Sequence, residues 1–185
     1  MNISNKGIEL IKEFEGCYLN SYRCPAGVWT IGYGHTGNVK SGTKITKKEA
    51  ETLLLNDLRT FEKGVNALPY KLTQNQFDAL VSFSFNCGLG NLKKLTANNT
   101  RTLKEISNAL ILYNKANGKV LAGLTRRRKA EQQLFNSADT SSTLLQVAKD
   151  VILGKYGNGE TRKQKLKKAG YDYKQIQKLV NELLK

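Results

Sequence analysis

The sequence predicts an α+β domain followed by a small three-helix bundle, and three observations carry this expectation. Apolar residues recur at helical spacing in five segments of the first three quarters of the chain. A glycine-broken stretch, Tyr18 to Val39, follows the first segment and is typical of a short sheet. A polar linker over 138–142 then precedes three more helical segments. We therefore expect one domain over 1–137 and a module over 143–185.

The helical segments of the first domain have recognisable starts. Ile8, Ile11 and Phe14 share one face of the first helix. Three capping boxes, each a threonine followed three positions later by Glu or Gln, predict the starts of the next helices at Thr46, Thr73 and Thr102. The helix after Thr73 is apolar nearly all round, so we expect it to be the central buried helix.

The remaining segments of this domain complete the expected helical lobe. A last helix is predicted over Arg126–Phe135. The stretches Gly88–Gly90 and Asn114–Gly123 are expected to be loops.

Composition limits the classes of protein that fit. No stretch of about 18 apolar residues occurs, so no membrane insertion is expected. The first residues lack the apolar run of a signal peptide, which predicts synthesis and retention in a cytoplasm. Cys17, Cys24 and Cys87 have no metal-ligand spacing and the chain has one histidine, so we expect free thiols, no metal and no cofactor.

The chain is strongly basic. Its net charge is +15, of which the first 137 residues carry +10 and the rest +5. Such a charge favours an anionic polymer as the partner, either nucleic acid or a bacterial envelope with its carboxylates and phosphates. The sequence has no nucleic-acid motif, and its aromatic residues are not interleaved with the basic runs, so no nucleic-acid partner is expected.

The stretch from Glu15 to Thr36, E-G-C-Y-L-N-S-Y-R-C-P-A-G-V-W-T-I-G-Y-G-H-T, is the most informative part of the chain. Glu15 stands at the end of an apolar helix, where burial favours a protonated carboxylic acid of the kind that general acid catalysis requires. By spacing alone, a solvated carboxylate at a helix end is the more ordinary interpretation of Glu15.

This stretch resembles the active-site signature of phage-type lysozymes, glycoside hydrolase family 24. The resemblance continues in the motifs of Gln74–Gly88 and Gly123–Phe135. It implies a lysozyme-like α+β domain whose cleft, between a small antiparallel sheet lobe and a helical lobe, binds peptidoglycan. It also implies hydrolysis of the β-1,4 bond after N-acetylmuramic acid, with Glu15 as the catalytic acid.

The chain departs from that family at one catalytic position. Where the family usually has an aspartate, two residues after the tyrosine that matches Tyr22, this chain has Cys24. A thiol is mostly neutral at pH 7 unless a neighbour lowers its pKa. Three roles for Cys24 stay open: activating water as a thiolate, attacking directly, or hydrogen-bonding weakly. The alternative is a small packing residue. Thr30 matches the family threonine that holds the attacking water.

Four further residues acquire expected roles from the resemblance. His35 is expected to be structural and paired with Asp57 rather than catalytic. Asn86 is expected to face the cleft and bind substrate, although it is also explained as the end of a helix before Gly88. In the run Arg126–Arg128, usually a solvated charge run, the resemblance places Arg127 beside Glu15.

The C-terminal module contains the stretch V-A-K-D-V-I-L-G-K-Y-G-N-G-E-T-R-K-Q-K-L-K-K-A-G-Y-D-Y-K-Q-I-Q-K-L-V-N, from Val147 to Asn181. This stretch resembles the cell-wall-binding repeat known from a pneumococcal phage lysozyme. Its helices are expected from Thr143 to Leu153, from Glu160 to Ala169 and from Asp172 onward. The resemblance implies muropeptide as the ligand. Candidate contacts are Asp150, Asn158, Arg162, Tyr171 and Asp172. Helix caps and an apolar anchor explain Tyr171 and Asp172 without any ligand.

These readings together predict an endolysin that acts on bacterial peptidoglycan. We expect a monomer, made in the host cytoplasm and then acting at the cell wall, with a holin for its release. Within the enzyme class, the alternative is a lytic transglycosylase of the same substrate, which needs one glutamate and no second carboxylate. Outside that class, a catalytically impaired wall-binding protein and a basic nucleic-acid binder stay open.

Overall fold

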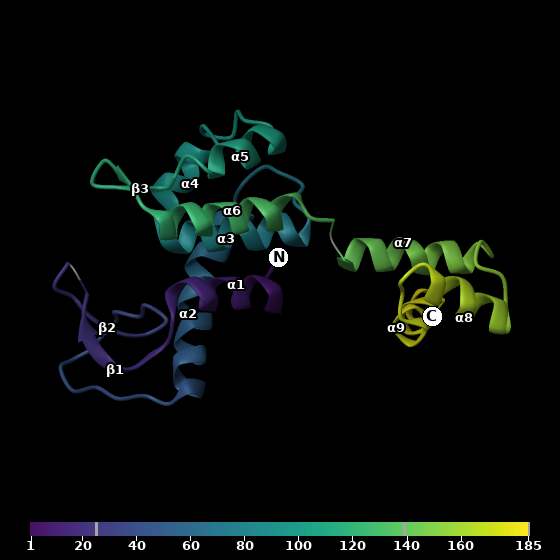
Figure 1. Ribbon diagram of the computed structural model, residues 1–185, viewed down its shortest axis with the longest axis horizontal. Coiled ribbons are helices and arrows are strands. Elements are labelled where there is room, and N and C mark those ends of the chain that lie inside the picture. Colours follow the sequence, from purple (N-terminus) through teal and green to yellow (C-terminus); the bar gives the residue numbers. More distant parts are fainter. Residues whose placement is uncertain (25, 139, 185) are drawn as a thin grey trace. The chain divides into compact units, whose positions relative to one another are not determined.

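The computed structural model describes residues 1–24, 26–138 and 140–184, with the backbone alone for 140–142. The chain divides into two compact units, Met1–Ser137 and Ala138–Lys185 (Figure 1). Among the residues described, no helix has the length and apolar character needed to span a membrane.

A small antiparallel sheet forms one part of the first unit. Strand β1 (Tyr18–Arg23) pairs with β2 (Trp29–Gly32), and Tyr22 lies opposite Thr30. Gly32 has a φ of 64°, and a Cβ at this position would lie 3.3 Å from the Cβ of Ala50. The glycine therefore lets β2 approach the following helix closely. Figure 1 shows both strands beyond the end of α1 and beside α2.

The helices that the sequence predicts for this unit are present. Their bounds are α1 Asn5–Glu15, α2 Lys47–Asn66, α3 Gln74–Cys87, α5 Leu103–Leu110 and α6 Ala122–Asn136. The capping boxes at Thr46, Thr73 and Thr102 are all formed, each with the threonine side chain and the Glu or Gln side chain accepting backbone N–H bonds. The local sequence thus fixes where three of these helices begin.

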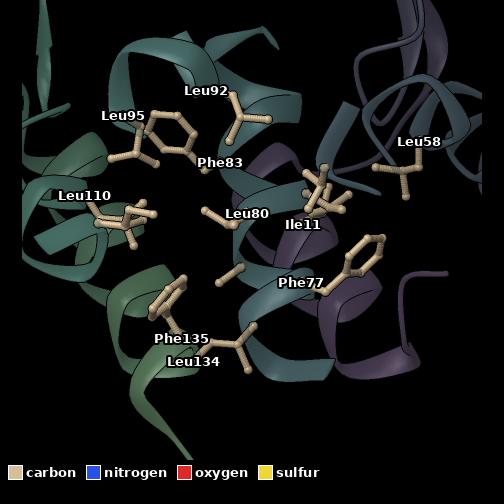
Figure 2. Close-up of a cluster of buried hydrophobic side chains, with 14 of the residues drawn as sticks. Ile11, Leu58, Phe77, Leu80, Phe83, Leu92, Leu95, Leu110, Leu134 and Phe135 are labelled. Carbon is tan, nitrogen blue, oxygen red and sulfur yellow. The ribbon is translucent and has the colours of Figure 1, made fainter. Parts of the chain in front are cut away.

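Helix α3 is the centre of the fold. Figure 2 shows buried side chains from the other helices converging on it. Each large apolar side chain removed from water contributes about 1.5–3 kcal/mol to folding. Because α3 packs against both α1 and α6, it fixes the two helices that carry Glu15 and Arg127. The labelled core residues are Ile11, Leu58, Phe77, Leu80, Phe83, Leu92, Leu95, Leu110, Leu134 and Phe135.

Three local expectations for this unit are wrong. A helix, α4 (Leu89–Leu95), follows Gly88 where a loop was expected, because Leu92 and Leu95 are buried in the core. A hairpin of β3 (Lys115–Ala116) and β4 (Lys119–Val120) lies in the second expected loop. Asn117 and Gly118 form its turn with φ of 50° and 76°, as two-residue hairpins require. Helix α6 begins four residues before Arg126.

The second unit is a bundle of α7 (Thr140–Ile152), α8 (Gly159–Lys168) and α9 (Tyr173–Leu183). Its own apolar cluster comes from all three helices, with Ala148, Leu166 and Ile176 fully buried. The Asp172 side chain accepts the Gln175 N–H at 2.7 Å and caps α9. The three helices that the sequence predicts are therefore present.

The expected linker, 138–142, is too long. Helix α7 already includes 140–142, so it starts three residues before the cap expected at Thr143. Thr-Ser-Ser contains neither glycine nor proline, so nothing in this tripeptide prevents the helix from extending over it. Asp139, also in the expected linker, and Lys185, the last residue of the expected module, lie outside the described residues.

Candidate active site

Glu15 is the last residue of α1 and lies on an open groove. The helix ends there because Gly16 takes a φ of 69° and donates its N–H to the Lys12 carbonyl at 3.1 Å. Two hollows, of about 590 and 370 Å³, both include Glu15 and Asn86 in their walls. We call them together the Glu15 groove. The Glu15 side chain is 21% exposed, so a polymer in this groove can reach its carboxylate.

Arg127 of α6 is the direct partner of Glu15. Its Nη1 donates to Glu15 Oε1 at 2.6 Å, across 112 positions of sequence. The Arg127 side chain is only 4% exposed, and its guanidinium carbon lies 5.7 Å from the centre of the Phe14 ring. A charge-assisted bond to a buried arginine fixes the orientation of the carboxylate. Glu15 Oε2, the oxygen outside this bond, lies 3.8 Å from where a Cβ on Gly34 would be.

Cys24 and Thr30 lie together where the hairpin of β1 and β2 turns. Cys24 donates its backbone N–H to the Val28 carbonyl at 3.0 Å, and the Thr30 hydroxyl donates to the same oxygen at 3.1 Å. The backbone N–H groups of Val28 and Ala26, with the Thr30 hydroxyl, lower the pKa of the Cys24 thiol below its ordinary value, although burial opposes them. The site therefore favours a thiolate more than water does.

The Cys24–Thr30 pair does not line either hollow of the Glu15 groove. Tyr22 links the two regions, because the negative forms of both Cys24 and Glu15 contribute to raising its pKa, after burial and Tyr18. The structure thus brings Cys24 and Thr30 together and places Tyr22 within electrostatic range of both Cys24 and Glu15. Tyr22 was present in the sequence motif, but spacing alone gave it no role.

His35 lies in the groove wall with a partner on each side of its ring. Its Nδ1 lies 2.8 Å from Asp57 Oδ2, and its Nε2 lies 2.9 Å from the Gly37 carbonyl oxygen. Asp57 belongs to α2, so the pair joins the segment after β2 to that helix. An imidazole held at both nitrogens is oriented rather than free to transfer protons to a substrate.

Asn86 lies where three hollows meet. It lines both hollows of the Glu15 groove and a third of about 510 Å³ that extends toward β3. Its Oδ1 accepts from Arg128 Nη2 at 3.1 Å, which leaves its amide nitrogen toward solvent or a ligand. Asn86 therefore combines access to the groove with an oriented side chain.

A buried carboxylate, Glu131, was missed by the sequence reasoning. It is fully buried on α6 and accepts from Arg127 Nε at 3.2 Å, Arg128 Nη2 at 2.9 Å and Ser82 Oγ at 2.7 Å. Burial raises the pKa of Glu131, while Arg128 and Arg127 oppose that effect. The available signal was its spacing, three and four positions after two arginines, which predicts contact on one face of a helix.

In the second unit, two of the five candidate wall-binding residues have acidic side chains with internal partners. Asp150 accepts from Lys155 Nζ at 2.8 Å and from Gln146 Nε2 at 3.2 Å, and Lys155 holds the pKa of Asp150 below its usual range. Asp172 caps α9. Both carboxylates are thus explained by the fold of the module.

The other three candidates lie around the turns of the module. Arg162 donates to the Gly157 carbonyl at 3.1 Å, to Asn158 Oδ1 at 3.0 Å and to Gln177 Oε1 at 3.2 Å. It therefore ties the turn before α8 to α9. Tyr171 packs against the apolar cluster of the module. The structure brings Arg162 and Asn158 into contact, and no described hydrogen bond joins them to Asp150 or Asp172.

No group of three or more His, Cys, Asp or Glu side chains in the described part of the chain is arranged as metal ligands would be. The Glu15 groove is lined by the carboxyl groups of Glu15 and Asp57 together with oriented polar groups, and the Cys24 thiol lies outside its two hollows.

Two family profiles match the chain, and between them they cover most of it. The phage lysozyme profile matches residues 12–131, and the CW_7 repeat profile matches residues 146–184. The endolysin of Acyrthosiphon pisum secondary endosymbiont phage 1 is 42% identical over 75% of this chain and 100% of its own length. The endolysin of Bacillus phage PZA is 42% identical over 84% of this chain and 63% of its own.

The chain spans about three fifths of the length of the PZA endolysin and of the endolysin of Bacillus phage B103. Among solved structures, the muramidase domain of SpmX from Asticaccaulis excentricus is 40% identical, with a TM-score of 0.68 over 74% of this chain and 99% of that one. The lysozyme of phage P22 is 36% identical, with a TM-score of 0.64 over the same share of both chains. The chain belongs to the phage lysozyme family.

Proposed function

We propose that this chain is an endolysin that hydrolyses the β-1,4 bond between N-acetylmuramic acid and N-acetylglucosamine in bacterial peptidoglycan. The observation that carries the proposal is Glu15, which lies in an open groove and is oriented by a buried arginine. Membership of the phage lysozyme family supports it. Residues 1–137 would form the muramidase domain, and 143–185 would hold the enzyme on the wall.

In this proposal Glu15 is the general acid. Its Oε1 accepts from Arg127, so the proton to be delivered resides on Oε2, on the side of Gly34. That proton passes to the glycosidic oxygen as the bond to the anomeric carbon breaks. An attacking water supplies oxygen to the anomeric carbon, and its proton goes to the Cys24 thiolate. Thr30 orients that water beside Cys24.

A lytic transglycosylase is the second candidate, and one observation favours it. Cys24 and Thr30 do not line the Glu15 groove, and the other carboxyl group in its walls, Asp57, is paired with His35, so no second carboxylate stands at the position of Cys24. In such an enzyme Glu15 gives its proton to the glycosidic oxygen as the bond from that oxygen to the anomeric carbon breaks, and the C6 hydroxyl of the same muramic acid attacks this carbon and returns its proton to the Glu15 carboxylate. The product then carries a 1,6-anhydro end and is lighter by one water.

Mass spectrometry of fragments released from purified cell walls tests both candidates. Reducing muramic ends in the products would support hydrolysis, and 1,6-anhydro ends would contradict hydrolysis and support the transglycosylase. A folded Glu15→Gln variant, which keeps the shape but carries no proton to give, should release products at least about 100-fold more slowly. Equal rates for this variant and the unaltered protein would contradict the role of Glu15, and no release by either would leave a wall-binding protein.

For the second unit we propose binding to the muropeptide of the cell wall, supported by the match to the CW_7 repeat. Asp150, Asn158, Arg162, Tyr171 and Asp172 remain the proposed contacts. Arg162 holds the turn before α8 through its bonds to Gly157 and Asn158. We propose that this turn is the surface that contacts the wall, so these bonds order the binding surface. We further propose that the protein is a monomer made in the host cytoplasm, and that a holin releases it to the cell wall.

A further inference from the structure

A buried cluster of charges lies behind the Glu15 groove. It contains two arginines and one carboxylate of α6, Arg127, Arg128 and Glu131, of which Arg128 and Glu131 are fully buried. Each arginine has a second partner at the groove. Arg127 reaches Glu15, and Arg128 Nη2 reaches Asn86 Oδ1. The cluster is therefore continuous with the groove.

Glu131 is the common partner of both arginines. Its Oε1 accepts from Arg127 Nε at 3.2 Å and from Arg128 Nη2 at 2.9 Å, and its Oε2 lies 2.9 Å from Arg128 Nε. Ser82 Oγ on α3 donates to the same Oε1 at 2.7 Å. Glu131 thus contacts both guanidinium groups, and each group has a second partner, Glu15 for Arg127 and Asn86 for Arg128, which fixes its orientation.

The Arg127 guanidinium is shared between two carboxylates. Its Nε faces Glu131, and its Nη1 faces Glu15. Coulomb interactions add, so the Glu15 side chain lies in the positive potential of Arg127 and, behind it, in the negative potential of Glu131. Glu131 can therefore act on Glu15 through its contact with Arg127 and through its own charge, although it does not line the groove.

We propose that Glu131 is a positioning residue that holds Arg127 against Glu15 and Arg128 against Asn86, and that it keeps Glu15 able to carry its proton by offsetting part of the positive potential of Arg127. The inference rests on the proposed role of Glu15 as general acid. The charged and titratable groups that face Glu131 are Arg127 and Arg128, with Cys87 beyond Arg128. Those around Glu15 are Arg127, Tyr22 of β1, and three groups that line the same hollows, His35, Asp57 and Arg126.

Two substitutions should shift the pH–rate profile in opposite directions. Glu131→Gln removes a negative charge from behind Arg127, so the potential at Glu15 becomes more positive and favours its carboxylate form. The alkaline limb of kcat/KM on soluble peptidoglycan fragments should then move down by about one pH unit. Arg128→Met removes a positive charge from the same cluster, so the potential at Glu15 becomes less positive. Glu15 then keeps its proton to higher pH, and the alkaline limb should move up.

The matched control is Leu134→Ala, which removes a core side chain of the same helix outside the cluster. Leu134→Ala should lower the melting temperature and leave the alkaline limb of kcat/KM unchanged. If Glu131 had a purely structural role, Glu131→Gln would give this same pattern. A ¹³C NMR titration of the Glu15 carboxyl carbon gives the same comparison without substrate. If Glu131→Gln does not fold, Arg128→Met carries the test. If the alkaline limb and the Glu15 titration of the folded variants coincide with those of the unaltered protein, the inference is overturned.

A measurement on the unaltered protein adds a test that needs no variant to fold. The Arg127 Nε–H, which is bonded to Glu131, should exchange with solvent about tenfold more slowly than that of the exposed Arg126. Equal exchange would contradict the inference. If the unaltered protein cleaves no glycan, the proposed function fails. If it cleaves but neither variant shifts the limb or the Glu15 titration, only the inference fails.

Discussion

At the scale of single residues, Cys24 is the proposed second catalytic group, and its surroundings bear on whether a thiol can serve there. Three donors from the hairpin turn and β2 favour its thiolate form. The backbone N–H groups of Val28 and Ala26 supply the larger effects, and the Thr30 hydroxyl adds to them. The hairpin thus compensates in part for the absence of a permanent anion at this position.

The lowered pKa of Cys24 predicts a particular pH dependence. Since the thiolate is the reactive form, alkylation of Cys24 by iodoacetamide should reach half its maximal rate at a pH below the ordinary value of about 8.5 for a free cysteine. Thr30→Val removes one donor and should move that midpoint upward. Site-resolved mass spectrometry measures both, with the exposed Cys17 as the internal reference.

The same residue predicts the acid limb of activity. Cys24→Asp should keep activity and extend it to lower pH, because an aspartate ionises near about 3.9. Cys24→Ala, which has no ionisable group, should be slower than Cys24→Asp at every pH. A fully active Cys24→Ala protein would mean that the cysteine only fills space beside Thr30.

The residues in and behind the candidate site differ in how far the sequence could predict them. Glu15, Cys24 and Thr30 belong to one continuous motif, so a resemblance could identify them. The contact between Glu15 and Arg127 joins residues 112 positions apart, and only the resemblance proposed it. Nothing local marks Glu131 as buried. Its spacing to two arginines is equally typical of a solvated helix face, and only the packing of α6 on α3 decides between them.

At the scale of elements, helix-capping motifs predicted helix starts correctly, whereas the lack of a helical signal was a poor predictor of loops. The three threonine capping boxes correctly predicted the starts of α2, α3 and α5, because a cap is formed by residues next to one another in sequence. Helix α4 was missed because Gly88 and Gly90 favour a loop locally. Burial of Leu92 and Leu95 outweighs that preference, and burial is a tertiary effect that the local sequence does not encode.

The pair of His35 and Asp57 is an element-scale contact, since it joins the segment after β2 to α2. Replacing a histidine bonded at both nitrogens should cost about 1 kcal/mol of unfolding free energy, because the pair is only partly shielded from water. His35→Asn should therefore lower the melting temperature by about 4 °C. The folded variant should cleave substrate at nearly the rate of the unaltered protein.

A double-mutant cycle with Asp57→Asn is the control for this pair. If the two side chains stabilise the fold through their mutual bond, the double variant should lose little more stability than either single variant. Additive losses would contradict the pairing. A hundredfold loss of activity in His35→Asn without any change in melting would instead make the histidine a catalytic group.

At the scale of the whole molecule, the two units have separate cores. The buried residues of the first cluster end at Phe135, and those of the second begin at Leu144. A chain that ends after Ala138 keeps Ser137, whose hydroxyl accepts from Asn75 Nδ2 at 3.1 Å. It should therefore fold and cleave soluble glycan fragments at an undiminished rate. Circular dichroism and a fragment assay measure these two properties, and unfolding on truncation would show that the module completes the first unit.

On intact walls the same truncated chain should be slower, and the deficit should grow as the enzyme is diluted. A tethered binding unit raises the local concentration of the active site at its polymer, and this advantage disappears when the enzyme is in excess. The alternative is that the module contributes only its net charge of +5. Salt distinguishes the two, because charge-driven attraction is screened at high ionic strength whereas a specific contact persists.

Two full-length variants that each lose one positive charge separate these explanations further. Arg162→Ala removes the three bonds that hold the turn before α8, whereas Lys167→Ala changes only an exposed side chain. Sedimentation with purified walls at moderate salt should show weaker binding for Arg162→Ala than for Lys167→Ala. Equal weakening would mean that the walls attract the module by charge alone, because both variants carry the same net charge and differ only in the turn that Arg162 orders.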